Sequence, residues 1–319
     1  HLGHTRWAAV GDALGRVLSA AGAAVTREFY INDRGRQMDL FGQSVQAAAT
    51  GQPIPEDGYQ GNYITDLAKE VVAANPKIET SEEFREAAYK VQLAQQQRVL
   101  ETFHTTFDVW FSERSLHESG AVEHGLEKLR SQGHVFEEAG AVWLRTTDFG
   151  DDKDRVIVKE DGALTYFASD TAYYINKRER GFDICIYMLG ADHHGYIHRL
   201  KATAACAGDN PEYNVEIMIG QLVKIMEGGE ELKLSKRAGT IITLEELVEK
   251  VGVDAARYTL IRYPVDTPMV MDVDVLRRNT NENPVYYVQY AHARIAAVLR
   301  SAQELKIGAG LDTFDPSQL

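Results

Sequence analysis

Two histidines at the start of the chain are the first residues whose types and spacing suit phosphate chemistry. The sequence opens His1-Leu2-Gly3-His4, and the apolar pattern that follows predicts an amphipathic helix over residues 5–21. The amino end of a helix attracts phosphate because its backbone N–H groups are free and its dipole is positive there. Imidazoles at that end could donate hydrogen bonds to phosphate oxygens, and Gly3 would let a nucleotide approach closely. The alternative is a chance His-x-Gly-His in a capping loop.

A basic segment much later in the chain is the second candidate. Residues 233–240 read KLSKRAGT, so the cations Lys233, Lys236 and Arg237 lie among small residues such as Ser235. Small residues favour a loop that can move, and its cations could close over a polyphosphate. The alternative is a solvated basic turn.

The third candidate follows a strand. Residues 184–189 form an apolar run of strand length, which is typical of a parallel strand covered on both faces. Gly190 and Asp192 come directly after it, at the strand-to-helix junction where open α/β sheets bind ligands. Asp192 could accept hydrogen bonds from ribose hydroxyls, and Gly190 would leave room for a sugar or a base. The alternative is that Asp192 only caps a helix.

The elements that must position these residues alternate between strands and helices, which favours an α/β protein. Strands are expected at residues 24–31, 141–146, 155–159, 184–189, 215–226 and 231–234. Helical patterns over residues 62–132 predict a helical insertion at about 51–140 within a domain spanning residues 1–280. A capping box at residues 243–246 predicts another helix. From residue 281 to 319 the pattern is helical, and its apolar stripe cannot be buried by one helix alone.

Composition excludes several classes of protein. The 319 residues are 44% hydrophobic and 25% charged, which is ordinary for a globular protein. No apolar run approaches the ~20 residues of a membrane span, and no secretory signal layout opens the sequence. Cys185 and Cys206 are too few for a disulfide framework, so a reduced cytoplasmic setting is expected. The net charge of −13 gives no global basic field for nucleic acid, although a local patch could still bind it.

The three candidates in combination resemble the signatures of a class I aminoacyl-tRNA synthetase. More closely, the chain is similar to the catalytic core of bacterial-type arginyl-tRNA synthetases. The family's wording recurs as FYINDRGRQ at 29–37, GDDKDR at 150–155, GADHH at 190–194, DAARY at 254–258 and NPVYYVQYAHAR at 283–294. The resemblance covers essentially the whole chain. It implies a Rossmann-like doubly wound parallel sheet with a helical insertion, followed at 281–319 by the beginning of an all-α anticodon-binding domain.

The resemblance also implies a reaction and its residues. The family activates L-arginine with ATP and Mg²⁺ to an arginyl-adenylate, then transfers arginine to the 3′-terminal ribose of tRNA(Arg). His1 and His4 would stabilise the α-phosphate, while Lys233 and Lys236 would hold the β- and γ-phosphates. The other ATP-binding residues would be Gly3, Gly190, Asp192, Ser235 and Arg237. The family has no essential zinc, and none is expected here.

The arginine pocket is expected around a Tyr-x-x-x-Asp pair that matches the family, Tyr166 and Asp170. Four-residue spacing on a helix places both side chains on one face. A carboxylate can bind a planar guanidinium bidentately, which the ammonium of lysine cannot reproduce. His193 is expected to contact arginine or ATP. An aromatic and an acidic residue on an exposed helix are the alternative for the pair.

The last motif suggests a contact with RNA. The residues expected to bind tRNA are Tyr287, Gln289, Tyr290 and Arg294. Aromatic side chains and a cation suit RNA, but packing against other helices suits the tyrosines equally well. The expected partners are therefore tRNA(Arg), L-arginine and ATP, for a monomer without membrane contact.

The sequence departs from the family at both ends. It starts at the first signature, so the tRNA-contacting domain and the first sheet strand of the family are missing, and strands beside that position should lack a neighbour. Most of the anticodon-binding domain is missing too, which predicts a fragment with weak activity or none. The alternatives are another class I synthetase, a nucleotidyltransferase that shares His-x-Gly-His, or a non-catalytic relic that binds ATP or tRNA.

Replacement of Lys236 by alanine should lower arginyl-adenylate formation by ~10²–10³, because one preorganised donor at a phosphoryl centre contributes about that much. The fold should not change. Pyrophosphate exchange in a competent enzyme measures this step, and an unchanged rate would remove Lys236 from the mechanism.

Overall fold

The computed structural model describes residues 2–232, 243–278, 280 and 282–306, and for residues 2–4 it describes the backbone. The strands are β1 (Glu28–Ile31), β2 (Val109–Ser112), β3 (Val135–Glu138), β4 (Ala141–Leu144), β5 (Arg155–Val158), β6 (Cys185–Gly190), β7 (Val215–Gly220), β8 (Val223–Glu227), β9 (Glu230–Glu231) and β10 (Met269–Asp272). The helices are α1 (Leu2–Ala20), α2 (Arg36–Thr50), α3 (Asn62–Ala74), α4 (Ser81–Thr102), α5 (Glu113–Glu118), α6 (Ala121–Ser131), α7 (Tyr166–Glu179), α8 (Tyr196–Cys206), α9 (Pro211–Asn214), α10 (Leu244–Val251), α11 (Val253–Ile261), α12 (Val273–Leu276) and α13 (Pro284–Glu304), with 3-10 turns η1 (Thr146–Phe149) and η2 (Ala191–His193).

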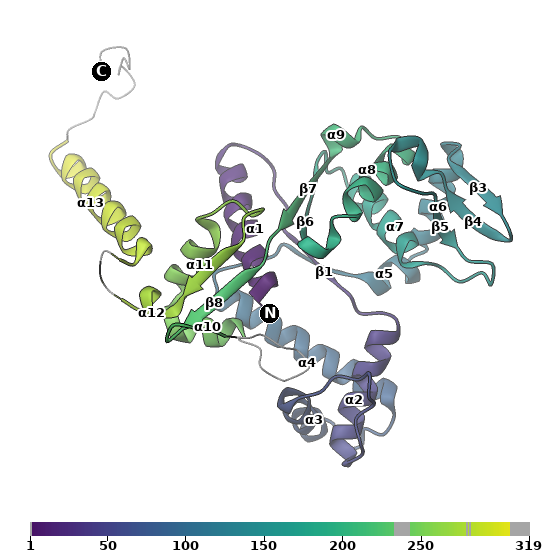
Figure 1. Ribbon diagram of the computed structural model, residues 1–319, viewed down its shortest axis with the longest axis horizontal. Helices are drawn as coiled ribbons and strands as arrows, with labels where there is room; N and C mark the ends of the chain where they lie inside the picture. Colours follow the sequence, from purple (N-terminus) through teal and green to yellow (C-terminus); the bar gives the residue numbers. More distant parts are fainter. Residues whose placement is uncertain (1, 233–242, 279, 281, 307–319) are drawn as a thin grey trace, which may run out of the picture.

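Parallel strand pairs form the α/β part of the molecule. In the described part of the chain, β1 pairs with β2, β6 with β7, and β8 with β10, each in parallel. Helices connect the two strands of each pair, as parallel neighbours require. An antiparallel sheet of β3, β4 and β5 lies at the other end of the molecule from α13 (Figure 1). The predicted α/β class with parallel sheets and a helical carboxyl-terminal portion is confirmed.

The parallel strands do not form one continuous ladder. Among the described residues, β1 pairs with β2 alone and β6 with β7 alone. Helix α7 connects the two pairs. The hydroxyl of Tyr173 on α7 donates to Glu28 of β1, and its ring lies 4.7 Å from that of Tyr30. The same helix contacts β6.

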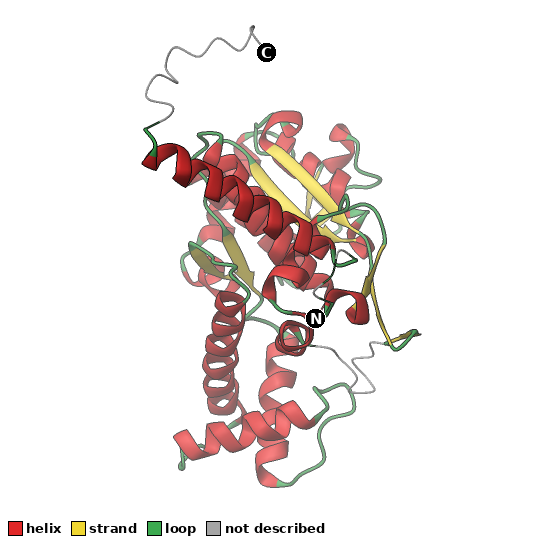
Figure 2. Ribbon diagram, turned by 90° about the vertical axis from the view of Figure 1, so that its left-hand side faces the viewer, coloured by secondary structure: helices red, strands yellow, loops and turns green. Residues whose placement is uncertain are grey.

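The helical patterns expected over residues 62–132 are interrupted by one strand. β2 lies inside the expected insertion and pairs with β1, with Phe111 opposite Tyr30. Four residues are too few to give a recognisable alternating pattern, so the helical signals on both sides concealed this strand. The helical part of the insertion is α2, α3 and α4, which pack on one another around a core that includes Phe41, Ile64 and Phe84. Figure 2 shows that these helices extend away from the strands.

Other boundaries differ by a few residues. The strand expected at 24–31 is β1 and begins at Glu28, while the strand expected at 215–226 is divided into β7 and β8. The division falls at Gln221, whose N–H donates to the carbonyl of Val265 instead of continuing a ladder (2.8 Å). The predicted capping box is confirmed: Thr243 Oγ1 accepts from the Glu246 N–H, and the Glu246 carboxylate accepts from the Thr243 N–H.

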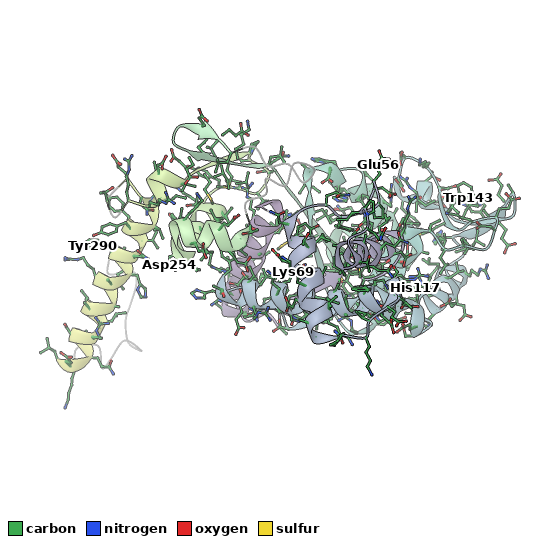
Figure 3. All side chains as sticks on the ribbon, turned by 90° about the horizontal axis from the view of Figure 1, so that it is seen from below. Glu56, Lys69, His117, Trp143, Asp254 and Tyr290 are labelled. Atoms are coloured by element: carbon green, nitrogen blue, oxygen red, sulfur yellow. The ribbon has the colours of Figure 1, made fainter. Side chains whose placement is uncertain are left out.

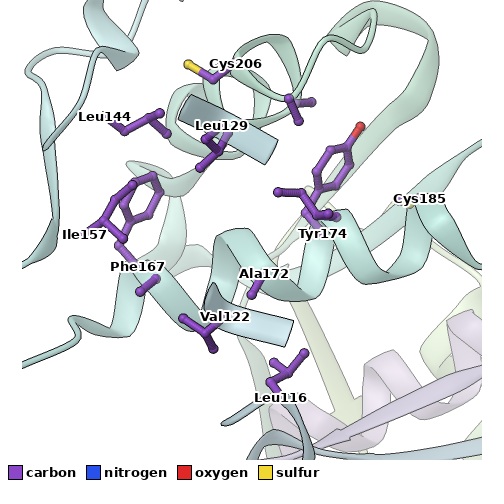
Figure 4. Close-up of a cluster of buried hydrophobic side chains, with 14 of the residues drawn as sticks. Leu116, Val122, Leu129, Leu144, Ile157, Phe167, Ala172, Tyr174, Cys185 and Cys206 are labelled. Carbon is purple, nitrogen blue, oxygen red and sulfur yellow. The ribbon is translucent and has the colours of Figure 1, made fainter. Parts of the chain in front are cut away.

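Buried apolar clusters hold these layers together. One cluster joins α6, α7 and α8 to the antiparallel sheet, and its members include Leu129, Leu144, Ile157 and Tyr174 (Figure 4). Tyr174 is fully buried, and its hydroxyl donates to Asp209 (2.7 Å). A second cluster joins α1, α10, α11 and α12 to β8 and β10.

Helix α13 extends away from the rest of the molecule (Figure 1). It begins at Pro284 as expected, with Asn283 as its cap. Its apolar stripe is largely exposed: Ile295 is 61% and Leu299 64% accessible. Thus one helix leaves the stripe uncovered here. No helix in the described ranges is long and apolar enough to span a membrane.

A buried carboxylate fixes α1 against its surroundings. Asp12, in the middle of α1, has a fully buried side chain that accepts hydrogen bonds from Arg16 (2.8 Å), Arg27 (3.2 Å) and Arg257 of α11 (2.5 Å). Burial alone would raise the pKa of Asp12, but the bonds from Arg16 and Arg257 outweigh it and hold the pKa below its usual value. Arg257 also donates to the carbonyl of Phe103, so the network joins α1, α11 and the end of α4.

Asp12→Asn should lower the free energy of unfolding by about 2–3 kcal/mol at neutral pH, because Arg27 and Arg257 would lose their shared charge partner. Since the folded-state pKa of Asp12 is lowered, its contribution is present above the unfolded pKa and is lost as the pH falls through the folded value. The difference between variant and wild type should therefore shrink in acid. Urea unfolding measures it, with Asp66→Asn, which changes an exposed carboxylate, as the surface control, and a difference that grows in acid would contradict the account.

Candidate active site

The first turn of α1 lies over the carboxyl ends of β6 and β7. These strands end in register at Gly190 and Gly220. A Cβ atom on Gly220 would lie 2.6 Å from the ring of Trp7, so only glycine allows the helix to come this close. One turn further along α1, a Cβ on Gly11 would lie 3.2 Å from Met188 Sδ of β6. The helix therefore runs antiparallel to the two strands, with its amino end at the sheet edge where α/β proteins bind ligands.

The two phosphate-binding signatures fall largely outside the described residues. The sequence predicted a helix from residue 5 with the histidines before it, but the backbone of α1 begins at Leu2. Gly3 and His4 therefore belong to the first helical turn, where the free N–H groups are. Five of the residues predicted to bind ATP lie outside the described ranges: His1, Lys233, Ser235, Lys236 and Arg237.

The chain leading to the basic segment comes from a sheet that touches α1. β8 and β9 form a hairpin, and the N–H of Leu232 donates to the carbonyl of Ile225 (2.9 Å). Helix α1 contacts β8 directly. The predicted closure of Lys233 and Lys236 over a triphosphate stays a prediction, and the approach of the chain to position 233 is consistent with it.

The loop after β6 presents a carboxylate to solvent. Asp192 lies in η2, and its side chain is 83% exposed, with His193 Nε2 at 3.7 Å from Oδ2. A Cβ on Gly190 would lie 2.6 Å from Asp192 Oδ1, so glycine lets the carboxylate fold back over the strand end. The predicted role of both residues in binding ribose stays a prediction, and Asp192 has the exposure that it requires.

Two acidic side chains lie near this loop, Glu113 at the end of β2 and Asp170 on helix α7, and together they form an acidic site. Glu113, the residue directly after β2, is only 5% exposed, and the hydroxyl of Tyr30 donates to its carboxylate. Asp170 of α7 is partly buried near Glu113. Neither carboxylate forms a salt bridge with any residue that the structure describes. The acidic site therefore holds negative charge that no side chain of the described chain neutralises by direct contact.

The pKa values of Asp170 and Glu113 are both raised. Burial raises the pKa of Asp170 to about 6, and repulsion from Glu113 adds to the rise. The positive charges of Arg199 and His193 oppose this rise. Burial likewise raises the pKa of Glu113. A cation bound between the carboxylates would reverse both shifts.

Tyr166 and Asp170 have the helical spacing that the sequence predicted, but they differ in environment. Tyr166 is the first residue of α7 and is 73% exposed. Its hydroxyl lies 3.9 Å from where a Cβ on Gly35 would be, so the ring extends towards the loop after β1. Asp170 reaches inward. Tyr166 is therefore exposed and Asp170 partly buried, and their role in binding arginine stays a prediction.

Glu113 is not among the site residues predicted from the sequence. Glu113 follows β2, a strand that was not predicted. The parallel pairing of β2 with β1 is what brings Glu113 next to Tyr30. Ser112, which caps α5, followed by an acidic first turn gave a usable signal. Asp33 anchors the same region: it accepts from Ser112 Oγ (2.6 Å) and from the N–H of Arg114 (2.9 Å).

The residues expected to bind tRNA lie on α13. Tyr287 and Tyr290 are exposed, and Tyr290 points away from the body of the protein (Figure 3). Arg294 Nη1 lies 3.2 Å from the Tyr290 hydroxyl. Gln289 is already engaged, because its amide donates to Asp254 of α11 (2.7 Å) beside a cavity of about 470 Å³. The contact with tRNA stays a prediction.

No group of three His, Cys, Asp or Glu side chains in the described ranges has an arrangement that could hold a metal ion. Both cysteines are buried and unpaired.

Solved structures share this fold. The arginyl-tRNA synthetase of Thermus thermophilus superposes with a TM-score of 0.68 at 20% identity, covering 95% of this chain and 62% of that one. The enzyme of Plasmodium falciparum gives 0.67 at 14% identity, over 94% of this chain and 56% of that one. The chain therefore shares its fold with these two proteins over most of its length.

Residues 1–295 match the family model described as tRNA synthetases class I (R), catalytic domain. A Campylobacter jejuni structure assigned as an arginyl-tRNA synthetase has a TM-score of 0.86 and 36% identity, covering 99% of this chain and 72% of that one. The chain thus belongs to the arginyl-tRNA synthetase family, and the resemblance found in the sequence is confirmed.

Curated relatives agree with this membership. The chain is 54% identical to the arginine–tRNA ligase of Pseudarthrobacter chlorophenolicus and 53% identical to that of Kineococcus radiotolerans. In both comparisons the whole of this chain is covered, and it spans 58% of the relative's length.

Proposed function

We propose that this chain is the catalytic core of an enzyme that joins L-arginine to tRNA(Arg) at the expense of ATP. The observation that carries the proposal is the pair of Glu113, which is buried, and Asp170, which is partly buried, two carboxylates without a salt-bridge partner in the described chain. A planar guanidinium can donate to both carboxylates at once, whereas the ammonium of lysine is a point charge. The acidic site therefore favours arginine among the amino acids.

The position of the acidic site suits activation of the amino acid. His193 lies close enough to Asp170 to affect its pKa, so the acidic site lies near the Gly190–Asp192 loop at the strand ends. An arginine held by its guanidinium would extend its carboxylate towards that edge. There, Asp192 and Gly190 would bind the ribose of ATP, and the first turn of α1 would face the phosphates.

In the first step, a carboxylate oxygen of arginine attacks the α-phosphorus of ATP. The bond from that phosphorus to the bridging oxygen breaks, and pyrophosphate leaves with Mg²⁺, which arrives with the nucleotide. His1 and His4, with the backbone N–H groups of the helix end, would stabilise charge on the α-phosphate. Lys233, Lys236, Ser235 and Arg237 would hold the departing phosphates. Such a displacement depends mainly on positioning and on charge stabilisation.

In the second step, a hydroxyl of the tRNA's terminal ribose attacks the carbonyl carbon of the adenylate, and AMP leaves. Tyr287, Tyr290 and Arg294 would contact the tRNA on α13, and Gln289 would do so if it leaves Asp254. We place the enzyme in the cytoplasm as a monomer, without an essential zinc.

Asp170→Asn in the full-length protein should raise the KM for arginine about 30-fold or more, because removal of one charge of a buried pair costs about 2 kcal/mol or more. The KM for ATP should change less than about threefold. Pyrophosphate exchange with each substrate varied in turn measures both constants.

Asp192→Asn is the matched control, since it should raise the KM for ATP and leave that for arginine unchanged. Equal effects of Asp170→Asn on both substrates would remove Asp170 from the arginine pocket. An active enzyme that charges tRNA with a different amino acid would overturn the proposed function.

Arginine binding should weaken as the pH falls through about 6, the pKa of Asp170 in the free acidic site. A raised pKa means that the carboxyl group is protonated below this pH, and a protonated carboxyl lacks the charge that holds the guanidinium. The KM for arginine should therefore rise up to about tenfold per pH unit below 6 and be constant above 7. Asp170→Asn should flatten the profile, and a flat wild-type profile from pH 5 to 8 would contradict the assignment.

A further inference from the structure

Arg6, in the first turns of α1, is a buried cation without a carboxylate partner in the described chain. Its side chain belongs to a residue that is 2% exposed. Nη1 donates to the carbonyls of Thr267 (3.0 Å) and Gln221 (3.3 Å), and Nη2 donates to those of Pro264 (2.8 Å) and Tyr263 (3.4 Å). One guanidinium therefore binds four backbone carbonyls that lie more than 200 residues away in the sequence.

These carbonyls belong to two loops that connect consecutive elements, here called the two crossings. Gln221 connects β7 to β8, and residues 263–267 connect α11 to β10. The crossings also bond to each other, because the Gln221 N–H donates to the Val265 carbonyl and the Met269 N–H to the Leu222 carbonyl. Tyr263 and Pro264 follow the carboxyl end of α11 directly, where the helix dipole favours a cation. The guanidinium thus joins α1 to the point where the β8–β10 sheet begins.

Core stability alone does not explain a charge at this place. Burial lowers the pKa of Arg6, with only Asp266 opposing it, and its Nε has no hydrogen-bond partner. An apolar side chain would avoid that desolvation cost, as it does for other buried ions. The planar fork of arginine does provide something an apolar residue cannot, a fixed spacing between several acceptors.

We propose that Arg6 is a positioning residue: it sets the amino end of α1, which carries His4, at a fixed distance from the β8–β10 sheet, which leads to Lys233. The proposal rests on the proposed function, in which these two ends act on one triphosphate. It assigns to Arg6 the alignment of the two ends, without contact with either substrate.

Arg6→Lys in the full-length protein tests it. The ammonium keeps the charge but cannot span carbonyls on both crossings, so the ends of α1 and β8 should lose their alignment. The kcat of arginine-dependent pyrophosphate exchange should fall at least tenfold, while the KM for ATP and for arginine stays within about threefold. Hydrogen exchange at the amides of Gln221, Thr267 and Met269 should accelerate at least tenfold. Arg6→Gln, a neutral donor, should show the same pattern more strongly.

Arg16→Lys is the control, because Arg16 lies on the same helix with an exposed side chain and does not bond to these carbonyls. It should leave both readouts within about twofold of wild type. Faster exchange of the three amides with an unchanged kcat would overturn the proposal, as would an equal rise in both KM values or loss of folding in both Arg6 variants. If wild type catalyses no pyrophosphate exchange, the proposed function fails, whereas the hydrogen-exchange result still reports whether Arg6 holds the two crossings together.

Discussion

The placement of α1 by two buried charges is the constraint on which the rest of the site depends. Asp12 binds Arg257 of α11, and Arg6 binds the carbonyls just beyond the same helix. Close packing of Trp7 on Gly220 then holds the helix to β7. An error in any of these contacts would move the helix end that faces the nucleotide, and buried charges tolerate such movement poorly because solvent cannot replace their partners.

The local charges of this molecule differ in sign from one site to another. The chain carries a net charge of −13, yet its proposed substrates include two polyanions, ATP and tRNA. The net charge therefore says little about partners, because attraction depends on local groups such as the helix end and the segment at 233–237. The negative charge has one evident local use, in the acidic site of Glu113 and Asp170. Burial disfavours the charged form of Asp170 when no ligand is bound, and a bound cation would favour that form.

The helical insertion is tied to the same acidic site. Asp33, at the end of β1, accepts hydrogen bonds from Tyr89 of α4 and from Ser112, the residue before Glu113. Arg114 continues the connection by donating to Glu86 of α4 (3.0 Å). A displacement of α4 would therefore reach the acidic site within one or two side chains. Helix α13 has no comparable connection, apart from its bond to Asp254 and its packing at α11.

The sequence by itself determined the features whose signals are local. Amphipathic patterns predicted α1 and α13, an apolar run predicted β6, and Thr243 with Glu246 predicted the start of α10. The spacing of Tyr166 and Asp170 and the family motifs indicated the substrates. The strand β2 was not predicted because four residues are too few to show an alternating hydrophobic pattern. Glu113, which follows β2, was therefore not predicted either.

Only the tertiary structure decided which distant residues meet. It showed that Glu113 and Asp170 lie near each other and that Trp7 packs directly on Gly220. It also showed that Arg6 donates to carbonyls near residue 265. Such contacts join segments separated by hundreds of residues, and nothing in the local pattern of either segment specifies the other. They arise because folding must bury charged and polar groups in pairs, and the partner is chosen by the packing of the whole chain.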